Sequence, residues 1–334
     1  MLRIPLLALL MVVILWFGAT LPRDVRGEDS VSAVLSVNGD LELFTPGDLA
    51  PRFSVAMDGP SLGPGRSFGC LQKRLAGQAG VTQVKNLPFG GLERDYRVHI
   101  SARASAETAQ PIVLAFHGRG GRGADFETSS GLLPVSDREG FLLVSPDGTG
   151  TPRGWGAGAS MPSWPVDDTA FVGSLLDRLE TDFCVDTTRI YAVGYSNGGF
   201  LASRIGCALG DRIAAIVPVG GISLPAEPCH GAVALLTFHG TADDVVPFNG
   251  GPVRTVYTYA GVRSVLSAWS ALARCSGAPV LQRISARVVR ENHQSCASPV
   301  SLVQITGGGH EWPTDTDVKV ADTIWTFLKD QHKP

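Results

Sequence analysis

Gly194-Tyr195-Ser196-Asn197-Gly198 connects a predicted strand, residues 189–194, to a predicted helix, residues 198–209. A serine on such a tight strand-to-helix turn presents its hydroxyl at the end of the strand, and the flanking glycines are needed because the turn leaves no room for side chains there. A serine hydroxyl is a weak nucleophile, so it needs a neighbouring base and a third group to orient that base. The turn therefore predicts that Ser196 is a nucleophile with an acid and a histidine elsewhere in the chain.

Two later motifs supply those partners. Residues 239–243 (HGTAD) and residues 307–310 (GGGH) each follow a predicted strand. We predict that His310 is the base and that Asp243 orients it and stabilises its cation. Asp244 is the alternative acid, and Asp243 is preferred because it follows the strand turn directly. The order serine, acid, histidine is the order found in α/β-hydrolases.

A further loop is expected to stabilise a negative oxygen. Residues 117–121 (HGRGG) follow a predicted strand that ends at Phe116. A tetrahedral intermediate needs backbone N–H donors aimed at its oxyanion, and the expected donors are the N–H groups of Arg119 and Asn197. His117 and His239 each precede a glycine at a strand end, which favours structural hydrogen bonding over a catalytic role.

Three tryptophans lie in loops next to the expected site. Trp155 and Trp312 are tentative substrate-binding residues, because an indole at a pocket can stack on an aromatic acyl group or a sugar. Trp164 is a weaker candidate. Core packing is the alternative for each of them.

The rest of the pattern predicts an α/β fold. Continuous apolar runs at residues 111–116, 141–145, 214–219, 232–238 and 300–305 predict strands covered on both faces. Predicted helices alternate with them, and the longest cover residues 168–183, 198–209, 258–273 and 317–329. This alternation predicts an α/β-hydrolase core, a mostly parallel central sheet with helices on both faces. Ligands bind such sheets at the carboxyl ends of the strands, where all three motifs lie.

The first residues and the composition bound the domain organisation. An uncharged run at residues 4–21 predicts that residues 1–27 are a secretory signal peptide, with an uncleaved membrane anchor as the alternative. Residues 28–68 are expected to be an irregular leader or a small N-terminal extension, and residues 69–330 the catalytic domain. The net charge of −3 gives no indication of a nucleic-acid partner. We expect a secreted protein that contacts a membrane only if the leader stays attached.

The cysteines agree with export. The chain has six, an even number that in an exported protein predicts three disulfides, although six cysteines allow 15 pairings. None has the spacing of a zinc site, so neither a metal nor a cofactor is expected.

Four motifs together resemble a known family. Residues 116–121 (FHGRGG), 184–188 (CVDTT), 194–199 (GYSNGG) and 239–243 (HGTAD) resemble the secreted feruloyl esterase and polyhydroxybutyrate depolymerase-like family. The resemblance covers about residues 68–330. Residues 166–188 are similar to fungal type D feruloyl esterases, whereas residues 307–313 resemble bacterial depolymerase-like members. The resemblance also implies the disulfides Cys70–Cys184, Cys207–Cys229 and Cys275–Cys296.

This resemblance implies a secreted serine esterase. Its expected substrates are feruloyl esters on plant cell-wall polysaccharide, with polyhydroxybutyrate (a polyester) and acetylated xylan as alternatives. A non-catalytic wall-binding protein is the alternative outside enzymes. A binding module, however, needs neither an exposed serine nor a glycine-flanked histidine.

Overall fold

The computed structural model describes residues 32–35, 41–44, 63–71, 78–105, 107–157, 166–226, 229–253, 257–313 and 318–333. The chain divides into two units, Met1–Gly59 and Pro60–Pro334. In the first unit, β1 (Ser32–Leu35) pairs antiparallel with β2 (Leu41–Phe44). The predicted signal peptide and Trp164 lie outside the described residues, and the predicted domain boundaries stay predictions.

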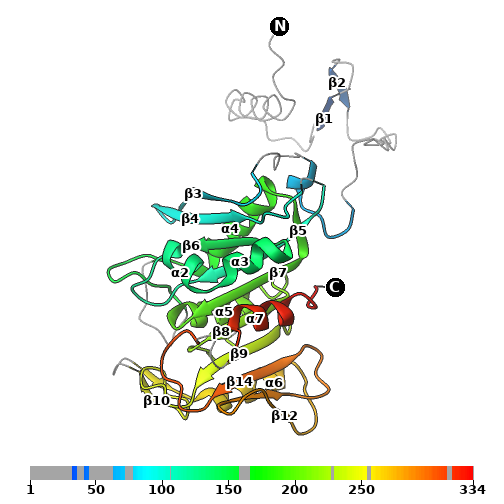
Figure 1. Ribbon diagram of the computed structural model, residues 1–334. Coiled ribbons are helices and arrows are strands. Elements are labelled where there is room, and N and C mark those ends of the chain that lie inside the picture. Colours follow the sequence, from blue (N-terminus) through cyan, green and yellow to red (C-terminus); the bar gives the residue numbers. More distant parts are fainter. Residues whose placement is uncertain are drawn as a thin grey trace, which may run out of the picture. The chain divides into compact units, whose positions relative to one another are not determined.

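A single ten-stranded sheet organises the second unit. Its strand order is β12-β13-β14-β9-β8-β7-β5-β6-β4-β3, with β3 at one end and β12 at the other (Figure 1). The strands are β3 (Val81–Phe89), β4 (Leu92–Ile100), β5 (Gln110–Phe116), β6 (Leu142–Pro146), β7 (Val185–Tyr195), β8 (Ala215–Val219), β9 (Ala234–Gly240), β12 (Val280–Arg283), β13 (Val288–Asn292) and β14 (Val300–Ile305).

The middle of this sheet is parallel and its two ends are antiparallel. Strands β6, β5, β7, β8, β9 and β14 pair in parallel. The hairpins β3–β4 and β12–β13 add antiparallel strands at the two ends. Every residue of β5, β6, β8 and β9 is buried, as their continuous apolar runs predict. A separate small pair, β10 (Gly251–Val253) and β11 (Tyr257–Tyr259), is antiparallel.

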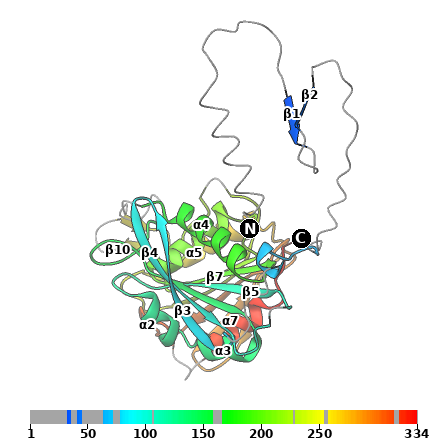
Figure 2. The same cartoon turned by 90° about the horizontal axis from the view of Figure 1, so that it is seen from above.

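Helices cover both faces of the sheet, which confirms the predicted fold class. One face packs against α4 (Asp168–Asp182), α5 (Asn197–Ala208) and α6 (Val262–Leu272) through side chains such as Phe171, Leu201 and Val265. The other face packs against α2 (Gly123–Ser129), α3 (Leu132–Glu139) and α7 (Val320–Leu328) through Leu132 and Ile324. Figure 2 shows α4 and α5 on one side of the sheet and α2, α3 and α7 on the other. A short 3-10 helix, η1 (Phe68–Leu71), precedes β3.

Local sequence signals explain where two of the helices begin. The Asp167 side chain accepts hydrogen bonds from the N–H groups of Thr169 and Ala170, so it caps α4 at the predicted start. The helix predicted from residue 258 begins only at Val262, because β11 occupies Tyr257–Tyr259. Gly261, at φ 87°, separates the two elements in a conformation that favours glycine.

All six cysteines form disulfides, in the pairing that the family resemblance implies. The bonds are Cys70–Cys184, Cys207–Cys229 and Cys275–Cys296. The first ties η1 to the residue before β7, and the second ties the end of α5 to the segment before β9. Within the part of the chain that the structure describes, no helix has both the length and the apolar character needed to cross a bilayer.

Candidate active site

Ser196 occupies the turn between β7 and α5 in a strained conformation. Its φ and ψ are 53° and −115°, a region that residues with a side chain rarely adopt. A Cβ added at Gly194 would lie 2.1 Å from the Gly198 carbonyl oxygen, and one added at Gly198 would lie 2.2 Å from the Phe116 carbonyl oxygen. The structure therefore confirms that both positions need glycine. The strained turn leaves the Ser196 side chain partly exposed.

Three residues from distant parts of the chain meet at this turn. His310, in the loop between β14 and α7, places Nε2 2.8 Å from Ser196 Oγ. Its Nδ1 lies 2.8 Å from Oδ2 of Asp243, which follows β9. In the neutral ring with its proton on Nδ1, His310 donates to Asp243 and accepts from the serine hydroxyl. Asp244, the alternative acid, is exposed.

The Asp243 carboxylate is buried and fully hydrogen-bonded. Oδ1 accepts from the N–H groups of Val245 at 2.9 Å and Val246 at 2.7 Å. Oδ2 lies near His310 and also 3.2 Å from Nε2 of His239. Burial raises the pKa of Asp243, but hydrogen bonds from His239, His310 and Val246 outweigh this and hold the pKa well below its usual range. Asp243 is therefore ionised at neutral pH.

His239 is a partner of Asp243 that the sequence did not reveal. Its side chain has 0% exposure, and its Nε2–H donates to the Val246 carbonyl at 2.8 Å while facing Asp243. Among the described residues its Nδ1 has no hydrogen-bond partner. The predicted structural hydrogen bonding of His239 is confirmed. Apart from the four-residue spacing between His239 and Asp243, nothing in the sequence motif predicts that the His239 ring faces Asp243.

His117 fixes the loop that follows β5. Its Nδ1–H donates to the Gly118 carbonyl at 2.7 Å, and its Nε2 accepts from the Gly148 N–H at 3.0 Å. Burial lowers the pKa of His117, so the ring stays neutral and both nitrogens stay bonded. This confirms the predicted structural role.

The expected oxyanion donors lie on the two segments that meet at Ser196. A Cβ added at Gly118 would lie 3.5 Å from Ser196 Cβ, so the residues around Arg119 approach the nucleophile closely. Asn197 is the first residue of α5. In the part of the chain that is described, neither the Arg119 N–H nor the Asn197 N–H has an intramolecular acceptor. Both groups are thus available to an oxygen near Ser196, and their role stays a prediction.

The structure corrects the expectation for Trp155. Its side chain has 0% exposure, with ring centroids 5.4 Å from Phe116 and 4.9 Å from His117. Its indole N–H donates to the His117 carbonyl at 2.8 Å. Trp155 therefore has no surface to offer a substrate, because its ring is buried against Phe116, His117 and the Arg94 guanidinium.

Trp312 packs next to Tyr195 and, unlike Trp155, is only partly buried. Its ring packs edge-on against Phe126 at 5.1 Å and Tyr195 at 6.3 Å. It also lines a groove of 450 Å³ shared with residues of α3 and the start of α7. Its contact with substrate stays a prediction.

Tyr195 supports the histidine loop, a role that sequence analysis missed. Its hydroxyl donates to the His310 carbonyl at 2.9 Å, and its ring lies 5.4 Å from the His310 ring. Burial, with smaller contributions from the Asp243 and Glu311 charges, raises the pKa of Tyr195 to about 12. The hydroxyl therefore stays protonated and keeps its donor. The variable position of a Gly-x-Ser-x-Gly motif gives no signal for this contact.

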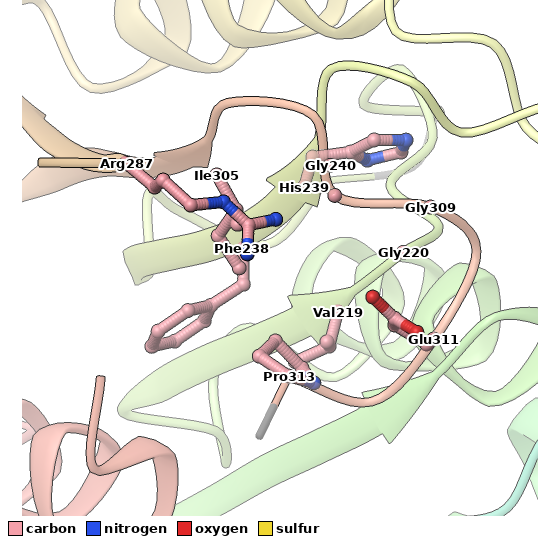
Figure 3. Close-up of a pocket in the computed structure, with 11 residues that line it drawn as sticks. Val219, Gly220, Phe238, His239, Gly240, Arg287, Ile305, Gly309, Glu311 and Pro313 are labelled. Carbon is pink, nitrogen blue, oxygen red and sulfur yellow. The ribbon is translucent and has the colours of Figure 1, made fainter. Parts of the chain in front are cut away.

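A small cavity of 50 Å³ is lined in part by Gly309 and Glu311, the two neighbours of His310 in the chain (Figure 3). Its lining residues are Val219, Gly220, Phe238, His239, Gly240, Arg287, Ile305, Gly308, Gly309, Glu311 and Pro313. It has room for a few water molecules and none for an aromatic acid. Among the described residues, no cluster of three or more His, Cys, Asp or Glu side chains could hold a metal ion.

Comparison with known sequences finds esterases. The chain is 30% identical over 319 residues to the putative esterase NocK of Nocardia uniformis subsp. tsuyamanensis, covering 84% of this chain and 92% of that protein. It is 29% identical over 243 residues to feruloyl esterase B of Piromyces equi, covering 67% of this chain and 43% of that protein. It is 26% identical over 243 residues to a probable feruloyl esterase C of Aspergillus clavatus, covering 70% of this chain and 83% of that protein. No family model matches the chain.

Comparison with solved structures finds the same fold. An acetyl xylan esterase from Aspergillus awamori superimposes with a TM-score of 0.59 at 14% identity, covering 75% of this chain and 99% of that one. An S-formylglutathione hydrolase from Agrobacterium tumefaciens superimposes with a TM-score of 0.52 at 13% identity, covering 75% of this chain and 96% of that one. At such low identity these matches show the shared α/β fold and nothing finer.

Proposed function

Since the chain belongs to the feruloyl esterase-like family of α/β-hydrolases, and is therefore a serine-type carboxylic ester hydrolase, we propose that Ser196, His310 and Asp243 are its catalytic triad. One observation carries this proposal. The continuous chain of contacts from Ser196 Oγ through His310 to Asp243 has both distances at 2.8 Å. That arrangement activates a serine in unrelated hydrolases, because the base is in reach of the hydroxyl and the acid holds the base in the right tautomer.

In the first half of the reaction, Ser196 Oγ attacks the ester carbonyl carbon while His310 Nε2 takes its proton. Asp243, held ionised by its donors, stabilises the imidazolium that forms. The carbonyl oxygen becomes an oxyanion and binds the N–H groups of Arg119 and Asn197. The tetrahedral intermediate then collapses, the C–O bond to the alcohol breaks, and His310 donates its proton to the leaving alcohol oxygen.

In the second half, a water molecule attacks the acyl-enzyme carbonyl while His310 again takes a proton. The second tetrahedral oxyanion occupies the same pair of N–H donors. Its collapse breaks the bond to Ser196 Oγ, which recovers its proton from His310, and the free acid leaves. Both halves use the same three side chains and the same two backbone donors.

The substrate proposed is a hydroxycinnamoyl ester of plant cell-wall polysaccharide. This rests on the names of the Piromyces and Aspergillus relatives, which are feruloyl esterases. Acetylated xylan is the second candidate, because a bifunctional acetylxylan esterase/xylanase of Neocallimastix patriciarum is 27% identical over 162 residues. Three disulfides are typical of an oxidising compartment, which supports a secreted enzyme. Residues 1–27 are the proposed export signal.

The test compares hydrolysis of methyl ferulate, acetylated xylan and a hydroxybutyrate oligomer ester by the wild type and by Ser196→Ala. Loss of the nucleophile should lower kcat by about four to six orders of magnitude on every substrate that the wild type turns over. Ser203→Ala is the matched control, because it removes a buried serine hydroxyl from α5 that bonds only within the fold. It should keep wild-type kcat. Turnover that survives in Ser196→Ala would show that another residue is the nucleophile.

A further inference from the structure

We propose that Trp155 is a positioning residue for the oxyanion hole. It forms hydrogen bonds with both segments that carry the predicted backbone donors, the loop after β5 and the start of α5. This inference rests on the proposed function, in which the Arg119 and Asn197 N–H groups bind the oxyanion. Trp155 does not touch the substrate. It acts through the segment after β5 and the start of α5.

The indole ring holds the first segment. Its Nε1–H donates to the His117 carbonyl at 2.8 Å, two residues before Arg119. The ring also packs against Phe116 and His117, which end β5 and begin the loop. The His117 carbonyl is therefore fixed by a buried hydrogen bond, and the peptide that carries the Arg119 N–H follows it directly along the chain.

The Trp155 backbone holds the second segment. Its N–H donates to Asn197 Oδ1 at 2.7 Å, and its carbonyl accepts from Asn197 Nδ2 at 3.1 Å. These two hydrogen bonds use both polar atoms of the Asn197 side-chain amide, in the pattern of a hydrogen-bonded residue pair between two β-strands. It fixes the side chain of the residue whose own N–H is the second predicted donor.

The segment around Trp155 is itself well supported. Thr149 and Gly154 exchange two backbone hydrogen bonds, at 3.0 and 2.8 Å, and the Gly120 N–H donates to the Arg153 carbonyl at 2.7 Å. On the other side of Trp155, the Gly156 N–H donates to the buried carboxylate of Asp168 at 2.7 Å. Trp155 is thus held from both sides and bonds both donor segments.

An oxyanion hole works because its donors are aimed before the reaction begins, and a shift of about 1 Å in a site can lower the rate about 100-fold. Trp155→Phe removes the indole N–H, leaves the backbone pair with Asn197 and keeps an aromatic ring. We expect kcat to fall about 10- to 100-fold while KM stays within about twofold. Acylation and deacylation should both slow, because both transition states use the hole.

Phenylboronic acid provides a second readout, because it forms a tetrahedral adduct with an active-site serine and places an oxygen in the hole. Its affinity for Trp155→Phe should fall by the same factor as kcat/KM. Trp269→Phe is the matched control: Trp269 has 1% exposure and its Nε1–H donates to the Ser223 carbonyl at 2.8 Å. It should lose similar thermal stability and keep both kcat and boronate affinity. If Trp155→Phe does not fold, replacing Trp155 with 3-benzothienylalanine removes the N–H and keeps a fused bicyclic ring of about the same size.

The positioning role is overturned if Trp155→Phe keeps wild-type kcat and boronate affinity, or if both tryptophan variants lose them equally. Failure of the proposed function has a different signature, namely activity that survives in Ser196→Ala. An active wild type that is silenced by Ser196→Ala but unaffected by Trp155→Phe would leave the triad in place and remove only the positioning role.

Discussion

Asp243 shows how one residue can be both buried and charged. Taking a carboxylate out of water is unfavourable unless hydrogen bonds replace the lost hydration. Asp243 receives two backbone N–H groups, His310 and the buried ring of His239. The next residue, Asp244, is exposed, and among the residues that the structure describes it has no such set of donors. The choice between two adjacent acids is therefore made by the turn after β9, which aims one inward and the other at solvent.

This arrangement predicts a pH-dependent contribution to stability. The pKa of Asp243 is held below its usual range in the folded protein, so its contribution is fully present above the unfolded value of about 3.9 and is lost as pH falls toward the folded value. Asp243→Asn should therefore lower the free energy of unfolding more at pH 7 than at pH 3. Urea denaturation at both values measures the difference, with Asp244→Asn as control. If Asp243→Asn lowered the free energy of unfolding by the same amount at both pH values, this prediction would be contradicted.

Sequence motifs predicted the residues on turns but not the direction of neighbouring rings. Gly194 and Gly198 identify the turn in the sequence, because a side chain at either position would clash with the backbone of a neighbouring segment. The contact of His239 with Asp243 and the cover over Trp155 depend on which loops fold together. No local pattern contains that information.

At the scale of elements, β4 and α4 are joined by a buried ion pair that no local pattern predicts. Asp167 and Asp168 look equivalent in sequence at the helix start, yet Asp167 caps α4 and Asp168 points inward to Arg94. The side chains of Arg94 and Asp168 have 2% and 0% exposure, and the Arg94 guanidinium stacks 3.9 Å from the Phe171 ring centre. The partner lies 74 residues away, whereas the parallel strands were predictable because each strand's apolar run is local.

Breaking this pair should be strongly destabilising. Arg94→Ala leaves the Asp168 carboxylate buried without its cation, and removal of one member of a buried pair typically lowers stability by about 3–5 kcal/mol. Arg178→Ala is the control, because the Arg178 side chain is 52% exposed and its partner Asp182 keeps Lys85 as a second cation. That change should alter the free energy of unfolding by about 0.5 kcal/mol or less. Urea denaturation at pH 7 measures both, and equal losses would refute the distinction.

The chain as a whole is cross-linked by disulfides that close loops of very different length. Cys70–Cys184 spans 114 residues and joins η1, near the start of the second unit, to the residue before the strand that leads to Ser196. Cys207–Cys229 spans 22 residues and Cys275–Cys296 spans 21. A cross-link restricts the unfolded chain more when its loop is longer.

The long disulfide should therefore contribute the most stability. The loop-closure term, 1.5RT times the logarithm of the loop-length ratio, makes the Cys70–Cys184 bond worth about 1.5 kcal/mol more than either short one. We expect Cys70→Ala/Cys184→Ala to lower the free energy of unfolding by that additional amount relative to Cys207→Ala/Cys229→Ala, with Cys275→Ala/Cys296→Ala matching the latter. Urea denaturation of the three double variants tests the order. Equal losses in all three would mean that packing around the sulfurs, and not chain entropy, sets their contribution, because only the entropic part depends on how much chain each bond encloses.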